Sequence, residues 1–206
     1  MTGWSILWFG IGLGVRHATD PDHVVVIAAL VDRERSALRA ARIAALWGLG
    51  HTATFLGLGL AIVLAGVKLP GALEVAAEAL VGVMLVALGA WHLLRLRRVE
   101  PAGSPPTAGT LRPLAFGLVH GLAGSAGAAL LASTTVPSPG LAATYLALVA
   151  LGTMLGMIGL TVALAGVGRA LQRRRRGRLV ALVGALLSLA LGTWMLGQLG
   201  VDALVG

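Results

Sequence analysis

The chain has 206 residues, of which 57% are hydrophobic and 12% are charged, and it contains 30 glycines and no cysteine. This composition excludes an ordinary soluble domain, because such domains carry about twice that fraction of charged residues. The lack of cysteine excludes thiolate metal sites and dithiol redox chemistry. The net charge of +8 does not indicate nucleic-acid binding, because the arginines lie in short stretches between apolar runs, where they determine membrane topology.

Six apolar segments are long enough to cross a bilayer as helices, which requires roughly 20 residues each. The segments cover residues 4–31, 40–67, 73–94, 111–134, 141–167 and 179–199. The sequence therefore predicts an all-α, polytopic membrane protein that forms a single transmembrane domain over residues 1–206. Because the N-terminal segment lacks a basic region and a small-residue cleavage pattern, we interpret it as the first span rather than as a signal peptide.

The positive charges predict the orientation of the six spans. Fourteen of the 16 lysine and arginine residues lie in or beside three connecting stretches, at residues 33–42, 95–112 and 169–178. Six spans place all three stretches on one side of the membrane, and the positive-inside rule assigns that side to the cytoplasm. We therefore expect a bacterial-type plasma-membrane protein with both termini outside. Lys68 falls on the opposite side, and Arg16 lies within the first span.

The two halves of the chain resemble each other in the order of short motifs. Gly14–His17 corresponds to Gly117–His120, Gly50-His51 to Gly152-Thr153, and Leu88–Trp91 to Leu191–Trp194. We predict a first three-helix repeat over residues 1–96, a cytoplasmic linker over 97–110 and a second three-helix repeat over 111–206. Because three spans are an odd number, the second repeat is inverted relative to the first, as in many secondary transporters.

The first span contains the most unusual stretch of the chain, which reads Arg16-His17-Ala18-Thr19-Asp20-Pro21-Asp22-His23. Proline interrupts a helix that precedes it. Aspartate followed by proline is also a favourable start for a new helix. The sequence therefore predicts a broken first helix, in which the break allows both histidine rings to point toward one place.

Ionisable side chains at membrane depth are costly to bury and usually serve a function. Imidazole nitrogens together with a carboxylate suit nickel, cobalt, copper or zinc. The candidate metal ligands are His17, Asp22, His23, His51 in the second span and His120 in the fourth. Asp20 and Arg16 belong to the same stretch, and the alternative is that its histidines and carboxylates only cap the break and pair with Arg16. His51 and His120 could likewise be structural hydrogen-bonding residues.

The His17-x4-Asp22-His23 pattern resembles the HX4DH signature of the nickel/cobalt transporter family. The Leu49-Gly50-His51 segment is similar to the second signature of that family, and Phe116–Ala126 looks like its UreH-type branch. The resemblance extends over most of the chain and implies secondary transport of Ni²⁺ or Co²⁺, with metal-binding roles for His17, Asp22, His23 and His51. The later Asp- and Thr-rich signatures of the larger, eight-span members are absent from this sequence.

We therefore expect a secondary transporter that moves Ni²⁺ or Co²⁺ across the cytoplasmic membrane, with uptake as the direction. The alternatives are a metal exporter and a membrane accessory protein that delivers metal to a partner in enzyme maturation. Export of a small anion or amino acid is disfavoured because two carboxylates stand beside Arg16. We expect no enzyme activity, since the HExxH pattern of zinc hydrolases and a nearby general-base glutamate are missing.

We expect the metal ion to be the transported substrate and not a prosthetic group. The expected partners are a divalent cation and the lipid bilayer, with no nucleic acid. Glycine-rich faces on the second and fifth spans could pack within one protomer or between two, which leaves a homo-oligomer open.

Overall fold

The computed structural model describes residues 3–31, 34, 36–97, 111–124, 136, 138–173 and 177–205. Regular structure within these residues is entirely α-helical, which confirms the predicted all-α class. The helices are α1 (Gly3–His17), α2 (Pro21–Val31), α3 (Ala37–Ala65), α4 (Gly71–Arg97), α5 (Leu111–His120), α7 (Pro139–Arg173) and α8 (Gly177–Val205).

Four helices, α3, α4, α7 and α8, are long and apolar enough to cross a membrane. They correspond to the second, third, fifth and sixth predicted spans. The first predicted span consists of the shorter helices α1 and α2, and the fourth is described as α5 and a turn that reaches Gly124. The rest of the fourth span and the predicted linker after Arg97 lie outside the described residues. The chain is a multi-pass membrane protein.

The break between α1 and α2 lies where the sequence predicts it. The amide of Thr19 donates to the carbonyl of Arg16 at 2.8 Å, and the amide of Asp20 donates to the carbonyl of His17 at 3.0 Å. These three-residue spacings tighten the end of the helix and stop it. Pro21, which has no amide hydrogen to offer, then begins α2.

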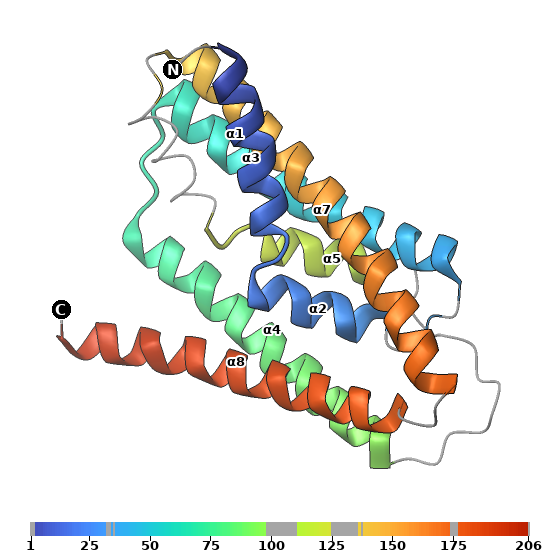
Figure 1. The fold of residues 1–206 in the computed structure, drawn as a ribbon. Helices are drawn as coiled ribbons and strands as arrows, with labels where there is room; N and C mark the ends of the chain where they lie inside the picture. Colours follow the sequence, from blue (N-terminus) through green and yellow to red (C-terminus); the bar gives the residue numbers. More distant parts are fainter. Residues whose placement is uncertain are drawn as a thin grey trace.

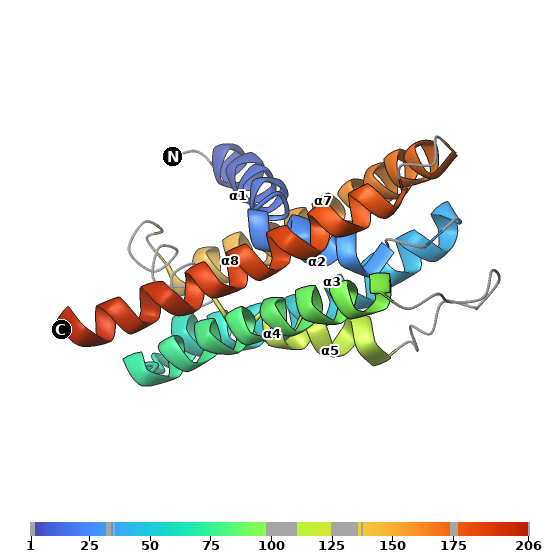
Figure 2. The same ribbon diagram turned by 90° about the horizontal axis from the view of Figure 1, so that it is seen from below.

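The helices pack mainly as four pairs. Helix α7 packs along both α1 and α3, α5 packs against α3, and α4 runs beside α8 over most of its length (Figures 1 and 2). The short helix α2 lies between these pairs and contacts α3, α4, α7 and α8. The break therefore places the start of α2 in the interior of the helical assembly.

Glycines allow the paired helices to approach backbone to backbone. A Cβ atom added to Gly117 of α5 would overlap the carbonyl oxygen of Trp47 on α3, and one added to Gly50 of α3 would overlap that of Leu114 on α5. The α1–α7 pair has the same arrangement, because a Cβ on Gly14 would overlap the carbonyl oxygen of Val149 and one on Gly152 would overlap that of Ile11. Side chains larger than hydrogen do not fit at these four positions.

The described arginines near the helix ends gather on one side of the molecule. Both views place the start of α1 and the end of α8 toward the left, and the ends of α2, α4 and α7 toward the right (Figures 1 and 2). On the right-hand side, Arg39 lies in the first turn of α3, Arg95 in the last turn of α4, and Arg112 in the first turn of α5. On the left-hand side, Glu74 lies in the first turn of α4. The described arginines of the connecting stretches thus share one side.

The largest buried cluster surrounds α2. Val26 and Ile27 of α2 pack with Trp47 of α3, Leu85 of α4 and Met157 of α7, and each of these side chains is at most 1% exposed. Burial on this scale fixes α2 between the long helices, and with it the polar residues of its first turn.

Candidate metal site

Five side chains from four helices meet where the first helix is broken. His17 ends α1, Asp22 and His23 stand in the first turn of α2, His51 lies in the middle of α3, and His120 ends α5. We call these five residues the His/Asp cluster. The exposed fractions of His23, His51 and His120 are only 1% to 2%. The structure therefore brings together all five residues that the sequence predicts as metal ligands.

His23 lies at the centre of the cluster. Its Nε2 atom is 3.3 Å from Nε2 of His51, and its Nδ1 atom is 3.2 Å from Nε2 of His120. Asp22 contacts two of the rings, because Oδ1 is 3.1 Å from Nδ1 of His23 and Oδ2 is 3.1 Å from Nε2 of His120. One carboxylate thus neighbours two imidazoles in an otherwise apolar interior.

His17 and Asp20 form a second contact at the edge of the cluster. Nδ1 of His17 lies 2.7 Å from Oδ2 of Asp20, and these side chains are 28% and 45% exposed. The ring of His17 also stands edge-on to that of His23, with 4.5 Å between the centroids. A histidine that uses one nitrogen for a carboxylate offers the other nitrogen to a metal, an arrangement common around bound metals.

The distances between donor atoms are those of hydrogen bonds and also match the separations between neighbouring ligands of a metal ion. With metal–nitrogen bonds of about 2.1 Å, neighbouring ligand atoms lie about 3.0 Å apart in octahedral and about 3.4 Å apart in tetrahedral geometry. The donor separations around His23 are 3.1 to 3.3 Å. The donor atoms form two groups, His17 with His23 and His51, and Asp22 with His23 and His120, each within 4.8 Å.

Arg16 differs from the other residues of the stretch. It is an exposed residue at the end of α1, and its carbonyl oxygen accepts a hydrogen bond from the Thr19 hydroxyl at 2.6 Å. The carboxylate of Asp20 contacts His17 instead. Among the described contacts, no ion pair joins Arg16 to either aspartate of the stretch, so pairing with Arg16 does not explain the two carboxylates.

The Trp47 side chain packs against the cluster, a role that the sequence analysis did not predict. Its ring is fully buried and lies 5.4 Å from that of His23 and 5.7 Å from that of His120, measured between centroids. Its indole nitrogen has no hydrogen-bond partner among the described residues. Trp47 precedes His51 by four positions on α3, so their helical spacing could have identified it.

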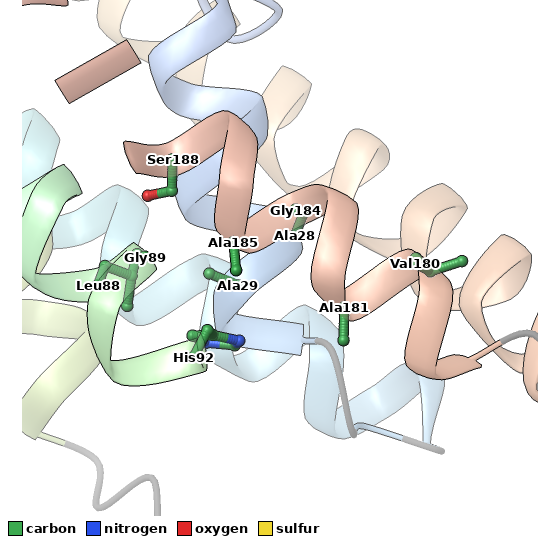
Figure 3. A pocket seen from close by; sticks show the side chains of 10 residues that line it. All are labelled: Ala28, Ala29, Leu88, Gly89, His92, Val180, Ala181, Gly184, Ala185 and Ser188. Carbon is green, nitrogen blue, oxygen red and sulfur yellow. The ribbon is translucent and has the colours of Figure 1, made fainter. Parts of the chain in front are cut away.

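His92 is the one histidine outside the cluster, and it faces a small cavity between α2, α4 and α8 (Figure 3). The cavity has a volume of about 30 Å³ and is lined mostly by alanine and glycine, with Ser188 at one edge. That volume holds roughly two water molecules. His92 is 9% exposed, and neither group of potential metal ligands includes it. It therefore serves as a comparison residue for the four histidines of the His/Asp cluster.

Comparison with known proteins identifies a relative. No protein-family model matches the chain, and no solved structure matches it. The urease accessory protein UreH of Bacillus sp. (strain TB-90) is 32% identical over 170 residues, an alignment that covers 76% of this chain and 75% of the relative. Identity of this extent, together with the predicted signature residues in one cluster, shows common descent. The chain belongs to the UreH-type branch of the nickel/cobalt transporter family.

Proposed function

We propose that this protein is a secondary transporter that takes up Ni²⁺ or Co²⁺ across the cytoplasmic membrane. The observation that carries the proposal is the convergence of four histidines and one carboxylate at a helix break in the membrane interior. Buried ionisable groups of this kind are costly unless they bind something. A divalent cation that leaves water needs such donors to replace its hydration shell.

The proposed ligands are the five residues of the His/Asp cluster. Asp22 supplies the negative charge, and the four imidazoles supply neutral nitrogen donors. Asp20 is proposed as a positioning residue, because its hydrogen bond to Nδ1 of His17 leaves Nε2 of that ring for the cation. Arg16 is given no ligand role.

The chemistry of the donors supports a late first-row metal. Imidazole with a single carboxylate suits nickel, cobalt, copper and zinc, whereas magnesium and calcium prefer oxygen donors. The name of the relative refers to urease, and uptake for urease is one of the roles that the family resemblance implies. We therefore propose Ni²⁺ first and Co²⁺ second as substrates.

We also propose that the two halves form an inverted repeat that rocks about the cluster. The close contacts are reciprocal, because α1 packs on α7 as α5 packs on α3, and Gly14 and Gly117 make equivalent approaches to their partners. In α4 and α8 the added Cβ of Gly192 would lie 2.7 Å from the carbonyl oxygen of Gly82, and that of Gly89 would lie 2.8 Å from the carbonyl oxygen of Ala185. Rocking of inverted repeats is a common route to alternating access.

The proposed orientation puts the arginine-rich side in the cytoplasm and both termini outside. In this orientation the cation enters from outside, exchanges water for the cluster, and leaves toward the basic side. Ni²⁺ and Co²⁺ content of cells that express the protein, measured by elemental analysis, tests the direction. Uptake predicts more metal than in vector controls and loss of the excess in His23→Ala. Less metal than in the controls would show export instead.

The second candidate function is an accessory protein that binds metal and passes it to a maturation partner. The relative is a urease accessory protein by name, which favours this alternative. The two functions differ in what the protein does alone, because a transporter moves metal through a bilayer without a partner and a delivery protein does not.

A further inference from the structure

The two ring nitrogens of His23 face different members of the cluster. Nε2 lies 3.3 Å from His51, while Nδ1 lies 3.1 Å from Asp22 and 3.2 Å from His120. The two groups of potential ligands therefore share His23 but no other residue. We call His17, Nε2 of His23 and His51 the first position, and Asp22, Nδ1 of His23 and His120 the second position.

A single cation does not use both nitrogens of one imidazole. The two lone pairs point away from each other in the ring plane, and a neutral imidazole carries only one of them, since the other nitrogen bears hydrogen. A cation on the Nε2 side is therefore bound by a different set of donors from a cation on the Nδ1 side. Filling one position also removes His23 from the other.

We propose that the cluster binds its cation at two overlapping positions, one on each side of the His23 ring, that are never occupied together. This inference rests on the proposed role of the cluster as the transported-metal site. The first position is built from the first half of the chain, because α1, α2 and α3 supply its three donors. The second position needs His120 from α5, so passage between them transfers the cation from one half of the chain toward the other.

The two positions also differ in charge. The first holds three imidazoles, whereas the second holds two imidazoles and the carboxylate of Asp22. A dication is thus partly neutralised only at the second position. The positions do not differ in accessibility, because the His17 side chain of the first is 28% exposed and the Asp22 side chain of the second is 26% exposed.

A titration of the purified full-length protein with Co²⁺, followed through the visible d–d bands, tests the two positions. His51→Ala removes a donor from the first position only, and His120→Ala removes one from the second only. If the two positions exclude each other, the overall association constant for Co²⁺ is the sum of the constants of the two positions, and the tighter position contributes at least half of that sum. At least one single variant therefore keeps the wild-type affinity to within about twofold. In the double variant, the fold decrease in Co²⁺ affinity is far larger than the product of the fold decreases in the two single variants.

A single shared site gives a different pattern. Each single variant then binds Co²⁺ at least about tenfold more weakly, and the two losses multiply in the double variant. That result overturns the proposal, and so does the binding of two Co²⁺ ions at once by the wild type. His92→Ala is the matched control, a histidine change outside both positions that leaves the titration unchanged. Should an alanine variant fail to fold by size-exclusion chromatography, the corresponding glutamine variant replaces it.

Failure of this inference is distinguishable from failure of the proposed function. If the variants give the two-position pattern but the wild type transports no metal, transport is refuted and the two positions stand. If the wild type transports metal but the affinity losses of the two single variants multiply in the double variant, only the two positions are refuted.

Discussion

Asp20 holds the ring of His17 by a hydrogen bond of 2.7 Å to Nδ1, although Asp20 itself is 45% exposed. A carboxylate in this place fixes the orientation and the tautomer of the ring. Its contribution to metal binding is therefore indirect, through the ring that it orients.

We predict that Asp20→Asn weakens Ni²⁺ binding by about 10-fold, at the lower end of the range for residues that orient a metal ligand. Asparagine still accepts a hydrogen bond and still suits the position before α2. The decrease in Ni²⁺ affinity therefore measures the effect of removing the negative charge. Isothermal titration calorimetry on the purified protein measures the change. Asp202→Asn, at an exposed position of α8, is the control with no expected effect, and equal affinities for all three proteins would refute the role of Asp20.

Trp47 offers a direct optical signal from the cluster, because its ring centroid lies 5.4 Å from that of His23. We predict that Co²⁺ and Ni²⁺ quench part of the tryptophan fluorescence and that Trp47→Phe removes most of this quenching. Phenylalanine keeps an apolar wall in place. Trp194→Phe is the control, since Trp194 is 60% exposed on α8. Equal metal-dependent quenching in wild type and Trp47→Phe would place the bound cation elsewhere.

The sequence was sufficient to predict which residues gather, but not how they are arranged. The spacing of His17, Asp22 and His23 around Pro21 is local, so a motif and a helix break predict it. His120 comes 97 positions after His23, and its contact depends on how α5 packs against α3. The split of donors between the two nitrogens of His23 depends on ring orientation, which no sequence pattern encodes.

At the scale of the elements, α5 and α3 are in backbone contact at Gly117 and Gly50, and these helices carry His120 and His51. A methyl group at Gly117 would overlap the carbonyl oxygen of Trp47. The overlap is with backbone, which does not move aside as a side chain does. The two helices must therefore separate to accept any larger residue.

We predict that Gly117→Ala destabilises the protein by about 1–3 kcal/mol, the usual effect of overfilling a packed interface. Thermal unfolding in detergent, followed by circular dichroism, measures this as a lower melting temperature. Gly57→Ala is the matched control, because Gly57 is an exposed residue of α3 and nothing lies within 4 Å of an added Cβ. An unchanged melting temperature for Gly117→Ala would show that the close approach is not required.

Helix boundaries were predictable where capping signals were strong and not where the helices continue past the apolar core. Pro21 fixed the start of α2. Helix α7 instead reaches Arg173, beyond the predicted end at residue 167, because arginine is compatible with a helix outside the apolar layer. The length of an apolar segment therefore indicates the part of a helix inside the membrane and underestimates the full length of the helix.

On the scale of the whole molecule, the described arginines of α3, α4 and α5 lie on one side, and the start of α1 and the end of α8 lie on the other (Figure 1). Because the chain contains no cysteine, single cysteines report topology without background. We predict that Lys68→Cys reacts with a membrane-impermeant maleimide in intact cells and that Ala37→Cys reacts only after permeabilisation. The cysteine-free protein is the control. The reverse pattern would invert the proposed orientation.

Transport by the protein alone is the central claim, and flux into liposomes that contain only the purified protein tests it most directly. A metal-sensitive dye trapped inside reports entry of Ni²⁺ or Co²⁺. We predict a protein-dependent flux that His23→Ala abolishes and that His92→Ala, outside the His/Asp cluster, leaves intact. If the wild-type protein binds the metal but produces no flux above empty liposomes, it is not an autonomous transporter, and delivery to a partner becomes the better account.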